Sequence, residues 1–152
     1  MQVSAKADYA IRAAMELAVA ENKGPLKGSR ISEAQDIPLK FLENILLELK
    51  HSGLVRTQRG AGGGYWLARP AEGISLAEII RVVEGPLANV RGEGPEAVEY
   101  TGAARPLQEV WIAVRANLRA VLECVTLADL IRGEIPDSVH NLTLDPQAWV
   151  RH

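Results

Sequence analysis

The sequence predicts a mainly α-helical fold with one small β-hairpin, and three observations support this class. Apolar residues recur at helical spacing in several separate stretches of the chain. The spacing changes to short β-favouring runs around the glycine-rich segment RGAGGGYW, residues 59–66. The composition, 47% hydrophobic and 24% charged over 152 residues, is that of a globular protein able to bury a core.

Three helices are predicted in the first third of the chain. Residues 4–20 place apolar side chains on one helical face, and residues 29–35 form a short helix that Ser29 can cap. Residues 36–38, Asp-Ile-Pro, then form a turn, because proline is best accommodated at the start of a helix. Residues 39–52 repeat the helical stripe. The apolar positions of this third helix are Leu42, Ile45, Leu46 and Leu49.

A β-hairpin is predicted for residues 54–69, where LVRT and YWLA flank the glycine loop. Glycine at this density serves a turn that other residues cannot make, or a close approach to another group. The surroundings are basic, since no Asp or Glu occurs from Leu49 to Ala71. Residues 1–70 hold ten Lys and Arg against seven Asp and Glu, whereas residues 71–152 hold seven against twelve. This asymmetry predicts an anionic partner for the surface around the loop.

The second half is predicted to contain a short helix, a long loop and a long helix. Ser75 and Glu78 have the spacing of a capping box at the start of the short helix. Residues 86–105 are rich in Gly, Pro and Glu and have little periodicity. The long helix carries apolar residues at alternating steps of four and three, the spacing by which a helix packs along a partner helix. This seam consists of Leu107, Trp111, Val114, Leu118, Val121 and Val125.

These elements divide the chain into four predicted parts. Residues 1–85 form a winged domain, and residues 86–105 form a loop. Residues 106–133 form the dimerisation helix and a last short helix, which Thr126 and Asp129 can cap. Residues 134–152 form a polar tail that is expected to be only partly ordered.

The order helix, short helix, turn, helix and basic-tipped hairpin is that of a winged helix-turn-helix. A helix of this kind enters the DNA major groove. The face of the third helix opposite its leucines shows Lys40, Glu43, Asn44 and Leu47, which suit contacts with base edges. The glycine loop is then the tip of a wing, and a narrow minor groove has a negative potential that attracts Arg59.

The predicted DNA-contacting residues lie on the second helix, the third helix and the hairpin. They are Ser29, Lys40, Phe41, Glu43, Asn44, Lys50, Arg56, Arg59, Gly60, Gly62 and Gly63. A nucleotide-binding loop is a poor alternative, because a P-loop needs Lys-Ser/Thr after its last glycine and the dinucleotide fingerprint needs a different spacing. A hairpin whose glycines only satisfy turn geometry is the simpler alternative, and the two helices before the loop favour the wing.

Three consecutive segments, DYAIRAAMELA, ISEAQDIPLKFLENILLELKHSGLV and RTQRGAGGGYWLARPAEGISLAEIIRVVEG, cover about residues 1–85. In this combination the chain resembles the Rrf-type winged helix-turn-helix transcriptional regulators. The segment LQEVWIAVRANLRAVLECVTLADL resembles the long dimerisation helix of that family. The resemblance implies a homodimer that presents two recognition helices to a pseudo-palindromic operator. It also implies that Lys40, Glu43 and Asn44 contact bases and that Arg59 is the wing arginine.

The chain departs from many members of this family in its loop. Those relatives carry three loop cysteines that ligate an iron–sulfur cluster, whereas the loop GPLANVRGEGPEAVEYTGAARP has none. This departure implies control without a cluster, as in the cysteine-metabolism repressors of the family, whose control can come from a partner enzyme of cysteine synthesis. Asp8 lies where some relatives place a carboxylate ligand, although a solvent-facing acid is the simpler interpretation. Cys124 has apolar neighbours and is expected to be a packed thiol.

The sequence therefore predicts a sequence-specific DNA-binding repressor that is a homodimer, uses no cofactor or metal, and is not an enzyme. A lone cysteine and the lack of an apolar run of ~20 residues predict a cytoplasmic protein. The expected partners are double-stranded DNA, a second copy, and a metabolic enzyme or small-molecule effector. Two alternatives stay open. One is a helical protein-interaction or enzyme-regulatory subunit, and the other is a metal or redox sensor that uses Asp8 and Cys124.

Overall fold

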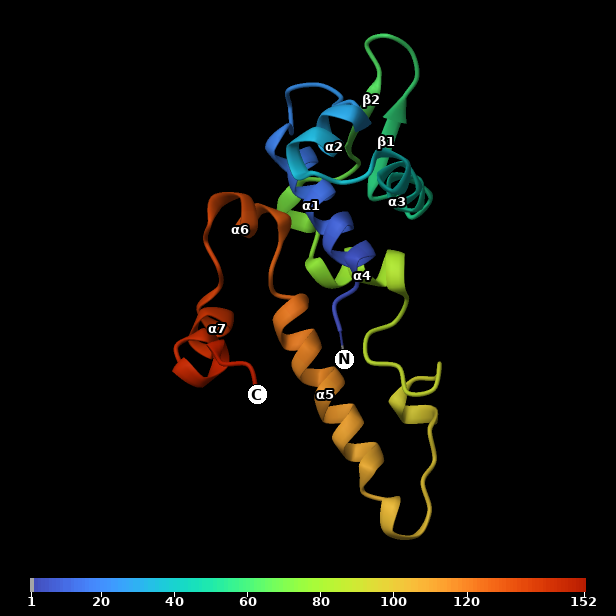
Figure 1. Ribbon diagram of the computed structural model, residues 1–152, viewed down its shortest axis with the longest axis vertical. Helices are drawn as coiled ribbons and strands as arrows, with labels where there is room; N and C mark the ends of the chain where they lie inside the picture. Colours follow the sequence, from blue (N-terminus) through green and yellow to red (C-terminus); the bar gives the residue numbers. More distant parts are fainter. Residues whose placement is uncertain (1) are drawn as a thin grey trace.

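A computed structural model describes residues 2–152, with the wing at one end of its long axis and a helix-and-loop arm at the other (Figure 1). The helices are α1 (Ala5–Val19), α2 (Gly28–Gln35), α3 (Leu39–His51), α4 (Leu76–Glu84), α5 (Leu107–Leu122), α6 (Leu127–Arg132) and α7 (Asp137–His140). The strands are β1 (Val55–Gln58) and β2 (Gly64–Leu67). The predicted mainly α-helical class with a small β-wing is confirmed.

Helix α1 is the centre of the winged domain, and α2, α3, α4, α6 and β2 all pack against it. Its buried face is made largely of alanine, which lets neighbouring helices approach closely. Ser4 caps its start, because the Ser4 Oγ accepts a hydrogen bond of 3.0 Å from the backbone N–H of Ala7. The helix predicted for residues 4–20 is confirmed to within a residue at each end.

Helix α2 begins one residue earlier than predicted, so the expectation that Ser29 caps it is wrong. The helix starts at Gly28, Lys27 occupies the capping position without a side-chain cap, and Ser29 lies in the first turn. The helix ends at Asp36, which takes the left-handed conformation with φ 51°. Asp tolerates this conformation better than most residues, and it produces the tight turn into α3.

Helix α3 has the predicted amphipathic pattern. Leu42, Ile45, Leu46 and Leu49 are all buried in the main core. Burial of a leucine or isoleucine side chain stabilises a fold by about 1.5–3 kcal/mol, so this leucine face holds α3 firmly in place. The opposite face is left for solvent or a partner.

The hairpin follows α3 directly, with β1 and β2 antiparallel in the register Val55↔Leu67 to Gln58↔Gly64. A third segment supports it. Leu26 and Tyr65 exchange two backbone hydrogen bonds of 2.8 Å each, so the loop between α1 and α2 braces the outer strand. The base of the wing is therefore tied to the helical core on both sides.

Only one of the two hydrogen bonds of the capping box predicted for α4 is present. The Ser75 Oγ accepts a hydrogen bond of 3.3 Å from the Glu78 backbone N–H, as expected. The Glu78 carboxylate pairs with Arg69 instead of returning to the Ser75 backbone. The predicted reciprocal capping box is therefore only half present at α4, whereas Thr126 and Asp129 form a complete one at α6.

Helix α6 belongs to the winged domain although it follows the arm in sequence. Leu127 and Ala128 lie in the same core as α1 and α3. Backbone hydrogen bonds of 3.0 Å run from Leu76 to the Val125 carbonyl and from Leu127 to the Ile74 carbonyl. The domain that the sequence assigned to residues 1–85 is thus completed by residues 125–132.

The arm consists of residues 86–106 and α5, which extend away from the winged domain (Figure 1). None of the residues of α5 is buried. The helix ends at Leu122, so Val125 lies beyond it and is itself buried, which shortens the predicted seam. Cys124 is exposed, so the expectation of a packed thiol is wrong.

The C-terminal segment forms α7 and short 3₁₀ turns, more local structure than the polar tail was expected to have. Its side chains are mostly exposed, and the Trp149 indole donates to the Thr143 carbonyl at 2.7 Å. No helix within residues 2–152 has the length and apolar character needed to cross a membrane.

Candidate nucleic-acid interface

The outer face of α3 is open and polar. Lys40, Glu43, Asn44 and Lys50 are exposed, and so is Leu47 between them. Phe41 is 42% exposed and packs edge-on against Tyr9 of α1, with ring centroids 5.7 Å apart. Phe41 therefore sits at the border between this face and the core, where Tyr9 holds it.

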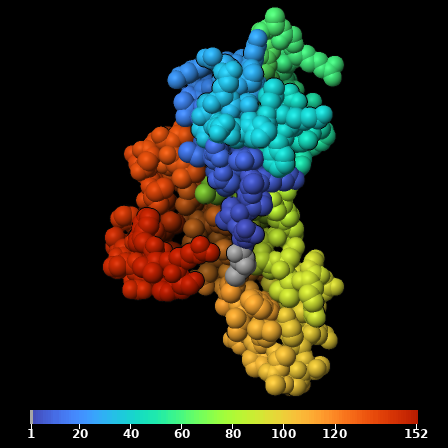
Figure 2. Space-filling model, viewed as in Figure 1, coloured from blue at the N-terminus to red at the C-terminus, as the bar shows by residue number. Residues whose placement is uncertain are grey.

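The wing stands beside α3 and projects beyond it, as the green segment at the upper end of Figure 2 shows. A groove of about 410 Å³ runs between the helix and the hairpin. From α3 it is lined by Glu43, Asn44, Leu47 and Lys50, and from the hairpin by Thr57, Gln58, Arg59, Gly64 and Tyr65. The structure thus brings the predicted helix face and the predicted wing residues into one continuous surface.

The cations of this surface lack carboxylate partners. Within residues 2–152, ion pairs involve Lys6, Arg12, Arg69, Arg81, Arg115 and Arg132. Lys40, Lys50, Arg56 and Arg59 are all exposed, and none of them is in an ion pair within that part of the chain. Exposed cations without carboxylate partners favour an anionic partner such as the phosphate backbone of DNA.

The glycines of the wing divide into two kinds. A Cβ atom at Gly63 would overlap the Gln58 carbonyl oxygen, and one at Gly64 would lie 2.6 Å from the Leu26 carbonyl oxygen. Gly63 permits a close approach within the hairpin, and Gly64 permits the approach of the loop between α1 and α2. Gly60, with φ 102°, and Gly62 have nothing within 4 Å of a Cβ position. The buried Gly63 therefore serves the turn, and Gly60 and Gly62 form the exposed part of the tip.

Helix α2 contributes an exposed N-terminal end beside this surface. Ser29 is exposed there, as are Lys27 and Arg30, which the sequence analysis did not select. Backbone N–H groups at a helix start, together with nearby cations, suit a phosphate contact. The signal that could have found Lys27 and Arg30 is their position in the first turn of the helix that precedes the recognition helix.

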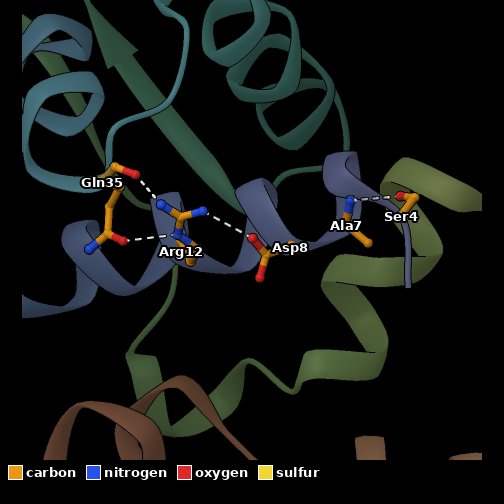
Figure 3. Close-up of polar contacts among 5 residues, drawn as sticks. All are labelled: Ser4, Ala7, Asp8, Arg12 and Gln35. Carbon is orange, nitrogen blue, oxygen red and sulfur yellow. Dashed lines mark hydrogen bonds and ion pairs between the residues drawn. The ribbon is translucent and has the colours of Figure 1, made fainter. Parts of the chain in front are cut away.

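Arg12 connects α1 to the turn before α3, a role that sequence reasoning missed. Its Nε donates to the Gln35 Oε1 at 3.0 Å, and a second guanidinium nitrogen donates to the Gln35 backbone carbonyl (Figure 3). Its remaining nitrogen pairs with the Asp8 Oδ2 at 3.0 Å, one turn earlier on α1. The Gln35 amide also donates to Glu16 at 2.6 Å. Arg12 thereby fixes the C-terminal end of α2, which the short turn of residues 36–38 connects to α3.

The predicted seam of α5 is only partly available to a partner. Leu107, Trp111, Val114, Leu118 and Val121 are half-buried. The Trp111 indole donates to the Tyr100 hydroxyl at 3.0 Å, so part of this face packs on the loop that precedes α5. The large apolar side chains of α5 that are exposed are Val110, at 51%, and Ile112, at 39%.

This arrangement of three core helices, turn and two-stranded wing defines a winged helix-turn-helix protein. The chain belongs to the Rrf2 family, described as iron-dependent transcriptional regulators, whose model matches residues 3–133. It is accordingly a transcriptional regulator of the helix-turn-helix DNA-binding kind, and not an enzyme.

Individual relatives agree with this assignment over nearly the whole chain. Rv1287 of Mycobacterium tuberculosis, whose name places it among HTH-type transcriptional regulators, is 45% identical over 97% of this chain and 92% of its own. The solved structure of CymR, titled the global cysteine regulator of B. subtilis, covers 88% of this chain and 98% of its own, with 32% identity and a TM-score of 0.75. The structure of T. potens IscR covers 88% of both chains, with 32% identity and a TM-score of 0.72.

The residues present do not fit the iron centre that the family description implies. Iron–sulfur clusters are held chiefly by several thiolates, and this chain has one cysteine, Cys124. Within residues 2–152, no three His, Cys, Asp or Glu side chains gather closely enough to hold a metal ion. Asp8, the other residue considered as a ligand, is engaged by Arg12.

Proposed function

We propose that this protein is a homodimeric repressor that binds a pseudo-palindromic promoter site in a sequence-specific manner and without an iron–sulfur cluster. The observation that carries the proposal is the continuous surface of α3 and the wing, on which four exposed cations lack ion-pair partners within residues 2–152. A protein that occupies promoter DNA in this way excludes the transcription machinery.

Helix α3 is the recognition helix in this proposal, with its leucine face held in the core and its outer face in the major groove. An asparagine can donate to and accept from adenine, a lysine can contact guanine, and a glutamate can accept from the cytosine amine. Asn44, Lys40 and Glu43 supply these three groups, and Leu47 supplies an apolar contact for a thymine methyl group.

The wing occupies the adjacent minor groove, with Arg59 at its tip and Gly60 and Gly62 allowing close approach. Lys50, Arg56 and the exposed start of α2 with Ser29 contact the phosphate backbone. Phosphate contacts set the register of the protein on DNA, whereas α3 supplies the discrimination between bases.

The homodimer forms through α5, which has no buried residue within its own subunit. Two copies related by a two-fold axis present two α3 helices to half-sites that mirror each other, as helix-turn-helix dimers do. The protein then acts in the cytoplasm and is associated with the nucleoid when it is bound to DNA.

The regulated genes include those of cysteine or sulfur metabolism, and the signal is a metabolic enzyme or a small molecule instead of a cluster. The support for the metabolic link is the similarity to CymR, titled the global cysteine regulator of B. subtilis. The support for a signal other than a cluster is the single cysteine in the chain.

Selection from random duplex DNA tests this proposal. The wild-type protein should enrich a two-fold symmetric motif. Asn44→Ala should relax the preference at one position in each half-site, by about 1–3 kcal/mol in discrimination, because the loss of a good base contact has that size. The matched control is Asn141→Ala, which removes an exposed asparagine far from α3 and should leave the motif unchanged.

Uniform weakening at every position by Asn44→Ala would show that this face does not read bases. The alternative, a helical protein-interaction module, predicts that no duplex is enriched at all. A gel shift with the chain's own upstream DNA and excess competitor DNA separates the two functions directly.

A further inference from the structure

A cavity between the winged domain and the arm is lined by three arginines from two helices. It has a volume of about 520 Å³ and lies between α4, the loop after it and α5. Arg81 comes from α4, and Arg115 and Arg119 come from α5, while Glu96 and Asn89 come from the loop. This volume is within the range of about 300–1,000 Å³ that small-molecule sites occupy.

Two of the three arginines have carboxylate partners, and the third, Arg119, has none within residues 2–152. Arg115 pairs with Glu96, and Arg81 pairs with Glu123, which is not among the lining residues. Arg119 is exposed, and within residues 2–152 it makes no ion pair. The lining therefore contains three guanidinium groups and one carboxylate.

The Glu96 carboxyl is held in its charged form beside these arginines. The pKa of its carboxyl is lowered from its usual range, first by a hydrogen bond from its own backbone N–H and then by the Arg115 side chain. The charges of Arg115 and Arg119 lower it further. The cavity thus stabilises a negative charge that is already present, and Arg119 has donors to spare for another.

We propose that this cavity binds a small multivalent oxyanion, a carboxylate or phosphate compound, as the effector of the regulator. The planar guanidinium fork matches the two oxygens of a carboxylate or phosphate group. Asn89 adds a side chain that can donate or accept, which suits a ligand with a further polar group. The assignment of the ligand as an effector rests on the proposed DNA-binding function, whereas the binding site itself does not.

The position of the cavity allows a bound ligand to influence where α3 lies. Helix α4 packs against both α1 and α3, and α5 carries the proposed dimer contact. A ligand held by Arg81 on one side and by Arg115 and Arg119 on the other fixes the angle between the winged domain and the arm. In a dimer this angle sets the spacing between the two recognition helices, on which binding to two half-sites depends.

The first experiment measures anion binding to the full chain by calorimetry and thermal unfolding. The probes are potassium citrate and potassium phosphate, each compared with potassium chloride of equal ionic strength. At least one probe should raise the unfolding temperature of the wild type, and the two probes together show which anion chemistry the site prefers. Arg119→Gln should weaken that binding by at least about tenfold, since hydrogen bonds to charged groups are among the strongest.

Arg105→Gln is the matched control, because Arg105 is also exposed, precedes α5 and lies outside the cavity. It should bind the probe as the wild type does. Arg119 is outside the core, so its replacement should leave the fold intact. Equal responses to chloride and to both probes, or equal weakening by the two substitutions, would overturn the site.

The second experiment measures operator affinity by fluorescence anisotropy with and without the probe at constant ionic strength. Coupling is reciprocal, so the factor by which the anion changes DNA affinity must equal the factor by which DNA changes anion affinity. If the bound anion leaves the DNA affinity unchanged, the effector role is overturned. Anion binding that depends on Arg119 in a protein that binds no duplex would sustain the site and refute the proposed function instead.

Discussion

Arg12 shows how much of the recognition geometry depends on one side chain outside the recognition helix. It donates to both the side chain and the backbone carbonyl of Gln35, at the end of α2, and its third contact is with Asp8 on its own helix. The two kinds of contact differ in how much they contribute to stability. The hydrogen bonds to Gln35 join separate elements, whereas the pair with the exposed Asp8 connects adjacent turns of one helix.

Arg12→Met should therefore destabilise the fold by about 1–3 kcal/mol, the usual cost of leaving partly buried hydrogen-bond partners unsatisfied. Urea denaturation followed by circular dichroism measures this change. Asp8→Asn is the control and should cost ~1 kcal/mol or less, because exposed ion pairs contribute little. Equal losses in the two variants would mean that Arg12 acts through Asp8 and not through the turn.

Individual residues were also the scale at which the sequence was least informative. The interpretation of Ser29 as a cap failed because the helix starts one residue earlier, at a glycine, which carries no capping signal. Glu78 has the right spacing for a capping box, but Arg69 on a neighbouring segment competes for its carboxylate. Cys124 lies just past the end of α5, where its neighbour Val125 is buried and the thiol is exposed. In each case a tertiary contact or a one-residue boundary decided the outcome.

At the scale of elements, the wing combines a rigid base with an open tip. Gly63 and Gly64 sit where a side chain would collide with backbone, while Gly60 and Gly62 face empty space. The glycine-rich segment thus serves both of the purposes that dense glycine can have, the close backbone approach and the exposed turn.

Gly63→Ala should distort the hairpin, because its Cβ atom would overlap the Gln58 carbonyl oxygen and backbone cannot move aside cheaply. We expect a loss of about 1–3 kcal/mol in stability, as in other overpacked sites, and faster amide exchange at residues 58–64. Urea denaturation measures the loss of stability, and hydrogen exchange followed by mass spectrometry measures the amide exchange. Gly62→Ala, in the same loop but with free space around it, should show neither effect. Unchanged amide exchange in Gly63→Ala would mean that the tip of the wing can accommodate the added methyl group without disturbing the strands at its base.

The elements of the winged domain could be predicted because their signals are local. The leucine stripe of α3 and the change of period at residue 54 specify a helix followed by a hairpin. The placement of the α3 face beside the wing follows from the same order of elements. The end of α5 and the return of α6 into the first core depend on contacts between residues about fifty positions apart, and no local pattern encodes those.

At the scale of the whole molecule, the long helix α5 packs little on the rest of the chain. No residue of α5 is buried, although Val110 and Ile112 are large and apolar. Val110 and Ile112 lie on different sides of the helix, and a whole helix without a buried residue is a surface that another chain can cover.

Ile112→Glu should weaken the proposed dimer by about tenfold or more, because a charge would have to be buried at a central contact. Analytical ultracentrifugation over a range of concentrations measures the dissociation constant. Leu144→Glu introduces the same charge at another exposed apolar residue, in the C-terminal segment, and should leave the dimer unchanged. A dimer that tolerates the change at Ile112 would place the contact on the half-buried seam or on another element.

The return of α6 into the core of α1 has a consequence for how such a protein can diversify. The chain leaves the winged domain after Gly85 and returns to it at Val125, where backbone hydrogen bonds join residues 125–127 to residues 74–76. Everything between these two points is an insertion fastened at both ends. Length, charge and ligand chemistry can therefore change in residues 86–124 while the winged domain keeps its core, and the ion pair that such changes put at risk is the exposed one of Arg81 with Glu123.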